Sequence, residues 1–530
     1  MEYKIGKVLK SQDGDTFVEI INGEDRCRIS LEEVGEDYPT VKRKLSPIGV
    51  HLLTSRSDRR FREQMQSAVP SGACLSAKRP GWLSNNIYVH PNGSIEKSEN
   101  EKRQIFTSFG LEPTYGKKGS HRKWLEGITP FYQAEKLLRF SLQFALSAVV
   151  VSKVPSQREN LIMELVGKPE FGKTTLARCA ASMFGGSDEG GLGIGRSASM
   201  TRNAFRQVLQ GCNDTLMFLD ETNVSDADAA ENLKVIFEAA SGEDRARYHD
   251  VDRKPPTRGA ILMTGNIPLE DHARTPPPIL EAARTRLLTM NMAEPIFTTL
   301  PEGYENRAAA ISALSHLVDH HYGTAGRKMI GKIIKDEPKF VGDLMKHIEW
   351  FLEKARNKAL PISDRQLRVF ALCYATGKIA TRAGILPASN VLKDVQSAMH
   401  SFCRCLEVTS KSPAVALLTD ALEKNAKHIR KVSPTKANSK HSEAMAWRYN
   451  DGDHVQVFFT SSTAENWFGS KKIRTIKSLC DEDVIRGEEG THCKPSIKAP
   501  KCIPHNGRVY STRLKKVDLP FFRQVRKKAS

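Results

Sequence analysis

The sequence lacks any long uninterrupted hydrophobic run. Its most apolar stretch, residues 140–151, is interrupted by Ser141, Gln143 and Ser147, and it is shorter than the ~20 residues that a membrane-spanning helix requires. The chain also starts without an apolar signal segment, and its 10 cysteines are scattered. We therefore expect a cytoplasmic protein with reduced thiols and no membrane insertion.

Internal repeats and low-complexity tracts are also lacking, and acidic residues are outnumbered by basic ones. The 530 residues include 80 lysines and arginines but only 61 aspartates and glutamates, which gives a net charge of +19. This excess favours a polyanionic partner, above all nucleic acid, although basic side chains that merely solvate the surface would give the same composition. The length predicts about three or four domains.

Changes of pattern along the chain predict its organisation. Residues 1–120 contain short alternating runs and turn signals, which predict a mixed α/β or β-rich domain. Residues 121–303 begin with a helical pattern and continue with apolar runs that alternate with helices, which is typical of a parallel α/β sheet. Residues 304–410 are mainly helical, residues 411–444 predict a lysine-rich linker, and residues 445–530 fit a small winged-helix unit with a basic tail.

A phosphate-binding loop is the most specific motif. Residues 167–174 match G-x-x-x-x-G-K-[ST], follow an apolar run and precede a helical pattern. Backbone amides of such a loop surround phosphate oxygens, Lys173 supplies positive charge to the β- and γ-phosphates, and the hydroxyl of Thr174 binds Mg²⁺. We therefore predict a site for ATP and Mg²⁺ formed by Gly167, Lys168, Pro169, Glu170, Phe171, Gly172, Lys173, Thr174 and Thr175.

Two carboxylates follow a second apolar run. Residues 215–219 lead into Asp220 and Glu221, and in a parallel sheet such residues lie at the carboxyl end of a strand, beside the P-loop. We expect Asp220 to bind Mg²⁺ through water and Glu221 to polarise the water that attacks the γ-phosphate. Two acids in these roles predict an enzyme that hydrolyses ATP.

Further candidates follow a third apolar run, residues 260–264. Asn266 would orient the attacking water, although a turn-forming asparagine is the alternative. Downstream, Arg284 and Arg286 precede another apolar run. One of them is a candidate arginine finger that enters the site of a neighbouring subunit, although a surface salt bridge explains such an arginine equally well.

With these elements in order, the chain resembles the mobile-element ATPases that contain the domain of unknown function 927 and, more distantly, the minichromosome maintenance helicases. Besides the P-loop, residues 81–93, 119–124 and 199–203 carry the resemblance. It implies an AAA+ core, Arg286 as the finger, and Arg365 at the start of a lid helix as a sensor of the γ-phosphate.

The same resemblance implies a hexameric ring that threads single-stranded or forked DNA during replication of a mobile element. The hairpin that grips DNA in such helicases would contain Arg245, Arg247 and Lys254, although interleaved acidic residues also fit a solvated loop. We therefore predict an ATP-dependent DNA helicase or translocase. Two alternatives stay open: a DNA-binding ATP switch that recruits partners without unwinding, and a small-molecule kinase.

Overall fold

The computed structural model divides the chain into two compact units, Met1–Cys403 and Arg404–Ser530. Among the residues that the structure describes, no helix is both long and apolar enough to cross a membrane. The described residues are 3–186, 193–222, 238–241, 256–269, 284–356, 360–409, 413–435, 444–482, 484–485, 495–515, 519 and 522.

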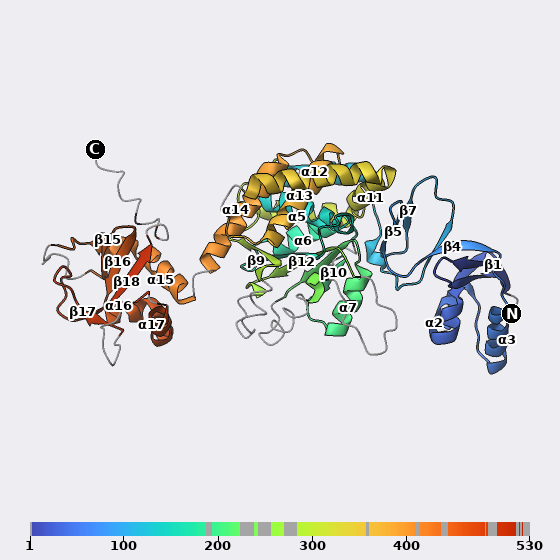
Figure 1. The fold of residues 1–530 in the computed structure, drawn as a ribbon, viewed down its shortest axis with the longest axis horizontal. Helices are drawn as coiled ribbons and strands as arrows, with labels where there is room; N and C mark the ends of the chain where they lie inside the picture. Colours follow the sequence, from blue (N-terminus) through green and yellow to red (C-terminus); the bar gives the residue numbers. More distant parts are fainter. Residues whose placement is uncertain are drawn as a thin grey trace. The chain divides into compact units, whose positions relative to one another are not determined.

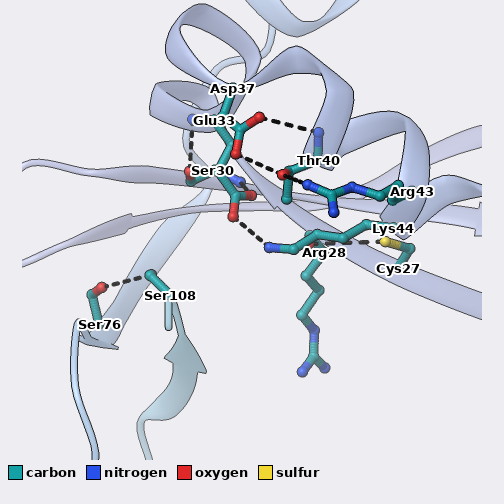
Figure 2. A network of polar contacts seen from close by, with 10 residues as sticks. All are labelled: Cys27, Arg28, Ser30, Glu33, Asp37, Thr40, Arg43, Lys44, Ser76 and Ser108. Atoms are coloured by element: carbon teal, nitrogen blue, oxygen red, sulfur yellow. Dashed lines mark hydrogen bonds and ion pairs between the residues drawn. The ribbon is translucent and has the colours of Figure 1, made fainter. Parts of the chain in front are cut away.

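The first unit begins with a five-stranded mixed sheet and three helices (Figure 1). The strand order is β3-β2-β1-β4-β8, in which β1, β2 and β3 are antiparallel and β4 and β8 are parallel to β1. Ser30 and Glu33 form a capping box that starts α1, and Glu33 pairs with Lys44 of α2 (Figure 2), so the two helices are joined at this point. The elements are β1 (Lys4–Ser11), β2 (Thr16–Asn22), β3 (Asp25–Ser30), α1 (Leu31–Glu36), α2 (Tyr38–Leu45), α3 (Ser55–Gln66), β4 (Gly72–Ala77) and β8 (Gln104–Thr107).

A small antiparallel sheet of β5 (Gly81–Ser84), β6 (Ile87–Val89) and β7 (Ile95–Lys97) follows β4. It is attached to the central part of the unit through Asp214. The backbone amide of Trp82 donates to the Asp214 carboxylate at 3.1 Å, and the hydroxyl of Tyr88 donates to the Asp214 carbonyl at 2.7 Å.

The central sheet contains the three strands that the apolar runs predict. The order is β10-β11-β12-β9-β13, and every pairing is parallel, so the prediction of a parallel sheet is confirmed. All residues of β9, β11 and β12 are buried, as expected for strands covered on both faces. The strands are β9 (Leu161–Gly167), β10 (Gly195–Ser197), β11 (Leu216–Asp220), β12 (Ala260–Gly265) and β13 (Leu287–Met292).

Helices cover this sheet and extend into a helical layer (Figure 1). Helices α5 and α6 pack on β12, α13 packs on α5, and α12 packs on α13. Because α6 continues directly from the loop after β9, the sheet fixes where that loop lies. The helices are α4 (His121–Ala134), α5 (Lys136–Ser147), α6 (Lys173–Ala181), α7 (Arg202–Gly211), α10 (Arg307–His320), α11 (Ala325–Lys335), α12 (Glu337–Arg356), α13 (Asp364–Arg382) and α14 (Val391–Thr409).

In the part of the second unit that the structure describes, a sheet of order β14-β15-β16-β18-β17 is accompanied by α15, α16 and α17. The predicted linker over residues 411–444 is wrong in part, because α15 occupies residues 413–424 and buries Leu418 and Leu422 completely in the core of this unit. Its apolar residues recur at helical spacing, which the lysine content of the surrounding segment obscures. The elements are α15 (Pro413–Lys424), β14 (Ile429–Lys431), β15 (Ala446–Asp451), β16 (His454–Phe459), α16 (Ser461–Phe468), α17 (Lys472–Asp481), β17 (Ile497–Lys498) and β18 (Arg508–Lys515).

Candidate nucleotide site

The loop between β9 and α6 has the backbone shape of an anion site. Gly172, the residue before α6, has φ of 90°, a left-handed conformation that glycine adopts without strain. A Cβ at this position would lie 2.5 Å from the side chain of Ile296, so both the conformation and the space require glycine. The turn delivers the first amides of α6 to the mouth of the loop, where a helix N-terminus favours negative charge.

Lys173 lies inside this loop. Its ammonium group donates to the carbonyls of Gly167 and Lys168, each at 2.8 Å, and to the side-chain oxygen of Asn266 at 3.0 Å. Burial lowers the pKa of Lys173, and the nearby Asp220 carboxylate opposes that effect. Asn266 directly follows β12, which lies between the P-loop strand β9 and the acidic strand β11, and this position brings its amide to Lys173.

The acidic half of the site faces the start of α6. The hydroxyl of Thr174 donates to Asp220 Oδ1 at 3.0 Å, and the hydroxyl of Thr264 donates to the same oxygen. Asp220 is only 8% exposed, and both of its hydroxyl donors are neutral. The structure therefore brings together Lys173, Thr174, Asp220 and Asn266 as the sequence predicts.

Glu221 leaves the sheet in a different direction from Asp220. Its backbone has φ of 59°, an uncommon left-handed conformation for a residue other than glycine, and its amide donates to the Thr264 hydroxyl at 3.2 Å. Glu221 is exposed, whereas Asp220 before it and Thr222 after it are buried. This turn presents the Glu221 carboxylate to solvent at the edge of the site.

Glu164 is a residue that the sequence reasoning missed. It lies in the middle of β9 and is completely buried. Its carboxylate accepts a hydrogen bond from the Thr222 hydroxyl at 3.3 Å and another from the Leu269 amide at 3.2 Å. Glu164 thus joins the segments that follow β11 and β12, which carry Glu221 and Asn266. The available signal was an acidic residue inside an otherwise apolar strand.

A pocket of about 650 Å³ opens beside the loop. The first turn of α10 forms part of its wall, and Arg307 is one of the lining residues there. Neither Asn306, which caps α10, nor the α10 residues of this wall were predicted, because nothing local in the sequence links them to the P-loop. The lining residues are Glu170, Gly172, Lys173, Thr174, Thr175, Asn306, Arg307, Ala308 and Ile311.

Arg286 and Arg365 lie elsewhere. Both pair with Glu159 Oε1, Arg286 at 3.1 Å and Arg365 at 3.4 Å. Glu159 precedes β9 and Arg286 precedes the parallel strand β13, so all three residues are at the amino end of the sheet. The P-loop is at the carboxyl end, about 20 Å away over a seven-residue strand. Arg365 therefore lies away from the P-loop of its own chain, and its role as a sensor of the γ-phosphate stays a prediction.

The capping residues of α13 fix this arginine cluster. Ser363 donates to the carbonyl of Thr285 at 3.0 Å, and the side-chain amide of Gln366 donates to the carbonyl of Arg284 at 2.6 Å and to that of Leu287 at 3.1 Å. The backbone around Arg286 is thereby tied to the first turn of α13, which carries Arg365. The three predicted DNA contacts, Arg245, Arg247 and Lys254, lie outside the described residues.

Comparison with solved structures places the fold among known ones. The structure titled "SCCmec type IV Cch - active helicase" is similar over 98% of this chain and 93% of that chain, with a TM-score of 0.57 and 16% sequence identity. At this identity the likeness establishes a shared fold. The A-form apo structure of the NrS-1 C-terminal region aligns with 74% of this chain and 89% of that chain at 11% identity, but its TM-score of 0.28 is too low to indicate a common fold.

At the level of sequence, no curated protein has a significant match to the chain. A family model does match, over residues 32–251. The matched range begins in the amino-terminal domain and includes the P-loop and the acidic pair. The matching model is that of a domain of unknown function, DUF927.

Proposed function

We propose that this protein is an ATPase with an AAA+ type of core that moves along DNA as a helicase or translocase. One observation carries the proposal. The Lys173 ammonium, the Thr174 hydroxyl and the Asp220 carboxylate converge at the carboxyl end of the sheet, where the Thr174 hydroxyl lies 3.0 Å from Asp220 Oδ1. The fold shared with a protein titled an active helicase supports the choice of DNA motor over small-molecule kinase, as does the net charge of +19.

The residues present fit ATP and Mg²⁺. The buried ammonium of Lys173 and the first amides of α6 suit phosphate oxygens. The Thr174 hydroxyl and Asp220 carboxylate provide the oxygen donors that Mg²⁺ prefers, directly or through water. The pocket of about 650 Å³ beside them is within the usual range for small-molecule sites. Mg²⁺, when bound, would neutralise charge on the phosphates.

The remaining roles follow from position. Glu221, exposed at the edge of the site, orients a water molecule and accepts its proton. Asn266 holds the Lys173 ammonium at 3.0 Å and can also direct that water. Glu164 fixes the segments that carry Glu221 and Asn266, because its carboxylate accepts hydrogen bonds from Thr222 and Leu269.

A ring completes the site. Because Arg286 and Arg365 lie at the end of the sheet opposite the P-loop, each reaches a triphosphate only in a neighbouring subunit. An arginine that enters from a neighbour stabilises the charge of the transition state. We therefore place the sites between subunits of a closed ring, a hexamer by resemblance to the minichromosome maintenance helicases, acting in the cytoplasm on DNA of a mobile element.

The test is hydrolysis and strand separation by the full chain. ATP turnover should rise when single-stranded DNA is added, and a forked duplex should be unwound. Lys173→Ala should abolish both activities, and Glu221→Gln should lower turnover by about 10²- to 10⁴-fold while ATP still binds. DNA-stimulated hydrolysis without strand displacement would instead support an ATP switch that recruits partners. If DNA has no effect on ATP turnover, the hypothesis of a DNA motor is wrong.

A further inference from the structure

Two helices of the second unit are joined by a three-residue turn. Helix α16 ends at Phe468, α17 begins at Lys472, and the turn between them is Gly469–Lys471. Gly469 has φ of 53°, in the left-handed region that lets the chain reverse tightly. A three-residue turn that contains glycine is typical of a helix-turn-helix, in which the second helix is the one that enters DNA.

Helix α17 has one buried and one exposed face. Thr475, Ile476 and Leu479 are buried, the last two in the core that α15 and α16 also line. Ile473, by contrast, is 83% exposed, the largest value among the exposed large hydrophobic residues described. Arg474 and Lys477 are exposed beside it. Residues three and four positions apart share one face of a helix, so an apolar side chain and two cations point outward together.

The neighbouring charges leave this face basic. Lys472 is engaged away from it, because its ammonium contacts Ser461 at 2.7 Å and Glu465 of α16 at 3.5 Å. Glu482 lies beyond the carboxyl end of α17, where it accepts a hydrogen bond from Ser478. Lys471, in the turn, is exposed and adds a further positive charge near Arg474.

The second unit also carries most of the excess charge of the chain. Residues 404–530 contain 25 lysines and arginines against 13 aspartates and glutamates, a net charge of +12 out of +19 for the whole sequence. A polyanion is thus favoured at this unit more than at the first. Duplex DNA provides both the charge and a groove about 12 Å wide that admits an α-helix.

We propose that α17 enters the major groove of duplex DNA, with Arg474 and Lys477 on phosphates or base edges and Ile473 against thymine methyl groups. The outward face of α17 presents no aromatic side chain among residues 471–477. Single-strand binding proteins use aromatic platforms on which bases stack, so this surface fits a duplex and not a single strand. The site is separate from the nucleotide site and requires no hydrolysis.

The experiment measures binding without motor activity. Full-length Lys173→Ala protein is titrated into a fluorescent duplex of about 20 base pairs, two helical turns, and into one strand of it, and anisotropy is recorded at several salt concentrations. The test variant is Arg474→Glu with Lys477→Glu. Lys427→Glu with Arg430→Glu is the matched control, because these residues are exposed cations of the same unit outside α17.

We expect the α17 variant to lose at least about tenfold in duplex affinity, and the slope of log affinity against log salt to shrink by about two, one for each contact removed. The control pair should change duplex affinity by less than about threefold. The affinity for the single strand should be unchanged in both double variants. Arg474→Ala with Lys477→Ala should show a smaller loss in the same direction. Duplex binding that survives in the α17 variants, or an equal loss in the control pair, would overturn the proposal. Melting curves check folding, since all four side chains are exposed.

Discussion

Glu164 and Thr222 are joined by a hydrogen bond of 3.3 Å. The carboxylate belongs to Glu164 in β9, and the hydroxyl belongs to Thr222, which follows β11. The same carboxylate holds the Leu269 amide at 3.2 Å. Each partner belongs to a segment that carries a proposed catalytic side chain. Glu164 is therefore a positioning residue, and its contribution can be separated from phosphate binding.

Replacement of Glu164 should affect turnover more than nucleotide binding. Glu164→Ala leaves the Leu269 amide buried without its acceptor, at a cost of about 1–3 kcal/mol in unfolding free energy, and lets the segments with Glu221 and Asn266 shift. We expect kcat to fall roughly 10- to 100-fold with little change in KM for ATP, since even small displacements of catalytic groups are costly.

Glu164→Gln provides the control for this prediction, because glutamine keeps the shape and one oxygen acceptor. It should recover most of the lost turnover. Equal loss of kcat in both variants, or a KM change as large as the kcat change, would contradict a positioning role.

Asn266 and Lys173 form a second testable pair. Asn266→Ala removes an acceptor at 3.0 Å from the ammonium, so we expect slower hydrolysis by about 10- to 100-fold with nucleotide affinity changed less than about fivefold. Asn266→Asp keeps the oxygen but adds a charge that favours the protonated lysine. If Asn266 serves only as a turn former, both variants should hydrolyse ATP at the wild-type rate, as measured by phosphate release.

The P-loop and the three strands around it could be predicted because their signals are local. The motif is contiguous, and the apolar runs that became β9, β11 and β12 have the length and composition of buried strands. The position of Asn266 beside Lys173 follows as well, since adjacent parallel strands bring their carboxyl ends together.

What could not be predicted depends on contacts between distant segments. Arg307 reaches the pocket only because α10 packs beside α6. Hydrogen bonds from Gln366 to the carbonyls of Arg284 and Leu287 bring Arg365 close to Arg286. No sequence pattern within residues 363–367 predicts that contact. The burial of α15 was hidden because its lysine-rich neighbourhood resembles a linker.

If nucleotide sites are shared between subunits, two inactive variants should restore activity when they are mixed. Lys173→Ala subunits retain their arginine, and Arg286→Ala subunits retain their P-loop, so each variant alone should be nearly inactive; loss of an arginine finger costs about 10³-fold or more. Random mixing of equal amounts places both intact halves at roughly a quarter of the interfaces of a ring. We expect ATP turnover to reappear in the mixture, measured after the subunits are allowed to exchange.

Arg284→Ala is the control for this mixing experiment, because Arg284 lies two residues away and the substitution keeps the backbone carbonyl that accepts a hydrogen bond from Gln366. It should remain active without a partner. A mixture no more active than its components, or full activity of Arg286→Ala alone, would exclude Arg286 as the shared residue.

The last prediction concerns the attachment of the β5–β7 sheet at Asp214. Burial raises the pKa of this carboxyl above its usual 3.8, although hydrogen bonds and the nearby Arg79 and Lys153 oppose the shift. A raised pKa in the folded state means that the stability contributed by protonated Asp214 is fully present below about pH 4 and is lost as the pH rises through the folded value. Asp214→Asn carries no charge at any pH. The difference between its melting temperature and that of the wild type should therefore shift in favour of the variant as the pH rises from 4 to about 8.

Tyr88→Phe tests whether such a trend is specific to the carboxyl. Its hydroxyl donates to the Asp214 carbonyl at 2.7 Å, and burial keeps the pKa of Tyr88 well above 10, so both tyrosine and phenylalanine are neutral over this range. Loss of the hydrogen bond should lower the free energy of unfolding by about 1 kcal/mol. The resulting decrease in melting temperature should not vary with pH. If the difference between Asp214→Asn and wild type is equally flat across the range, the carboxyl does not titrate within the folded protein there, and the junction between the small sheet and the central sheet is not linked to pH through Asp214.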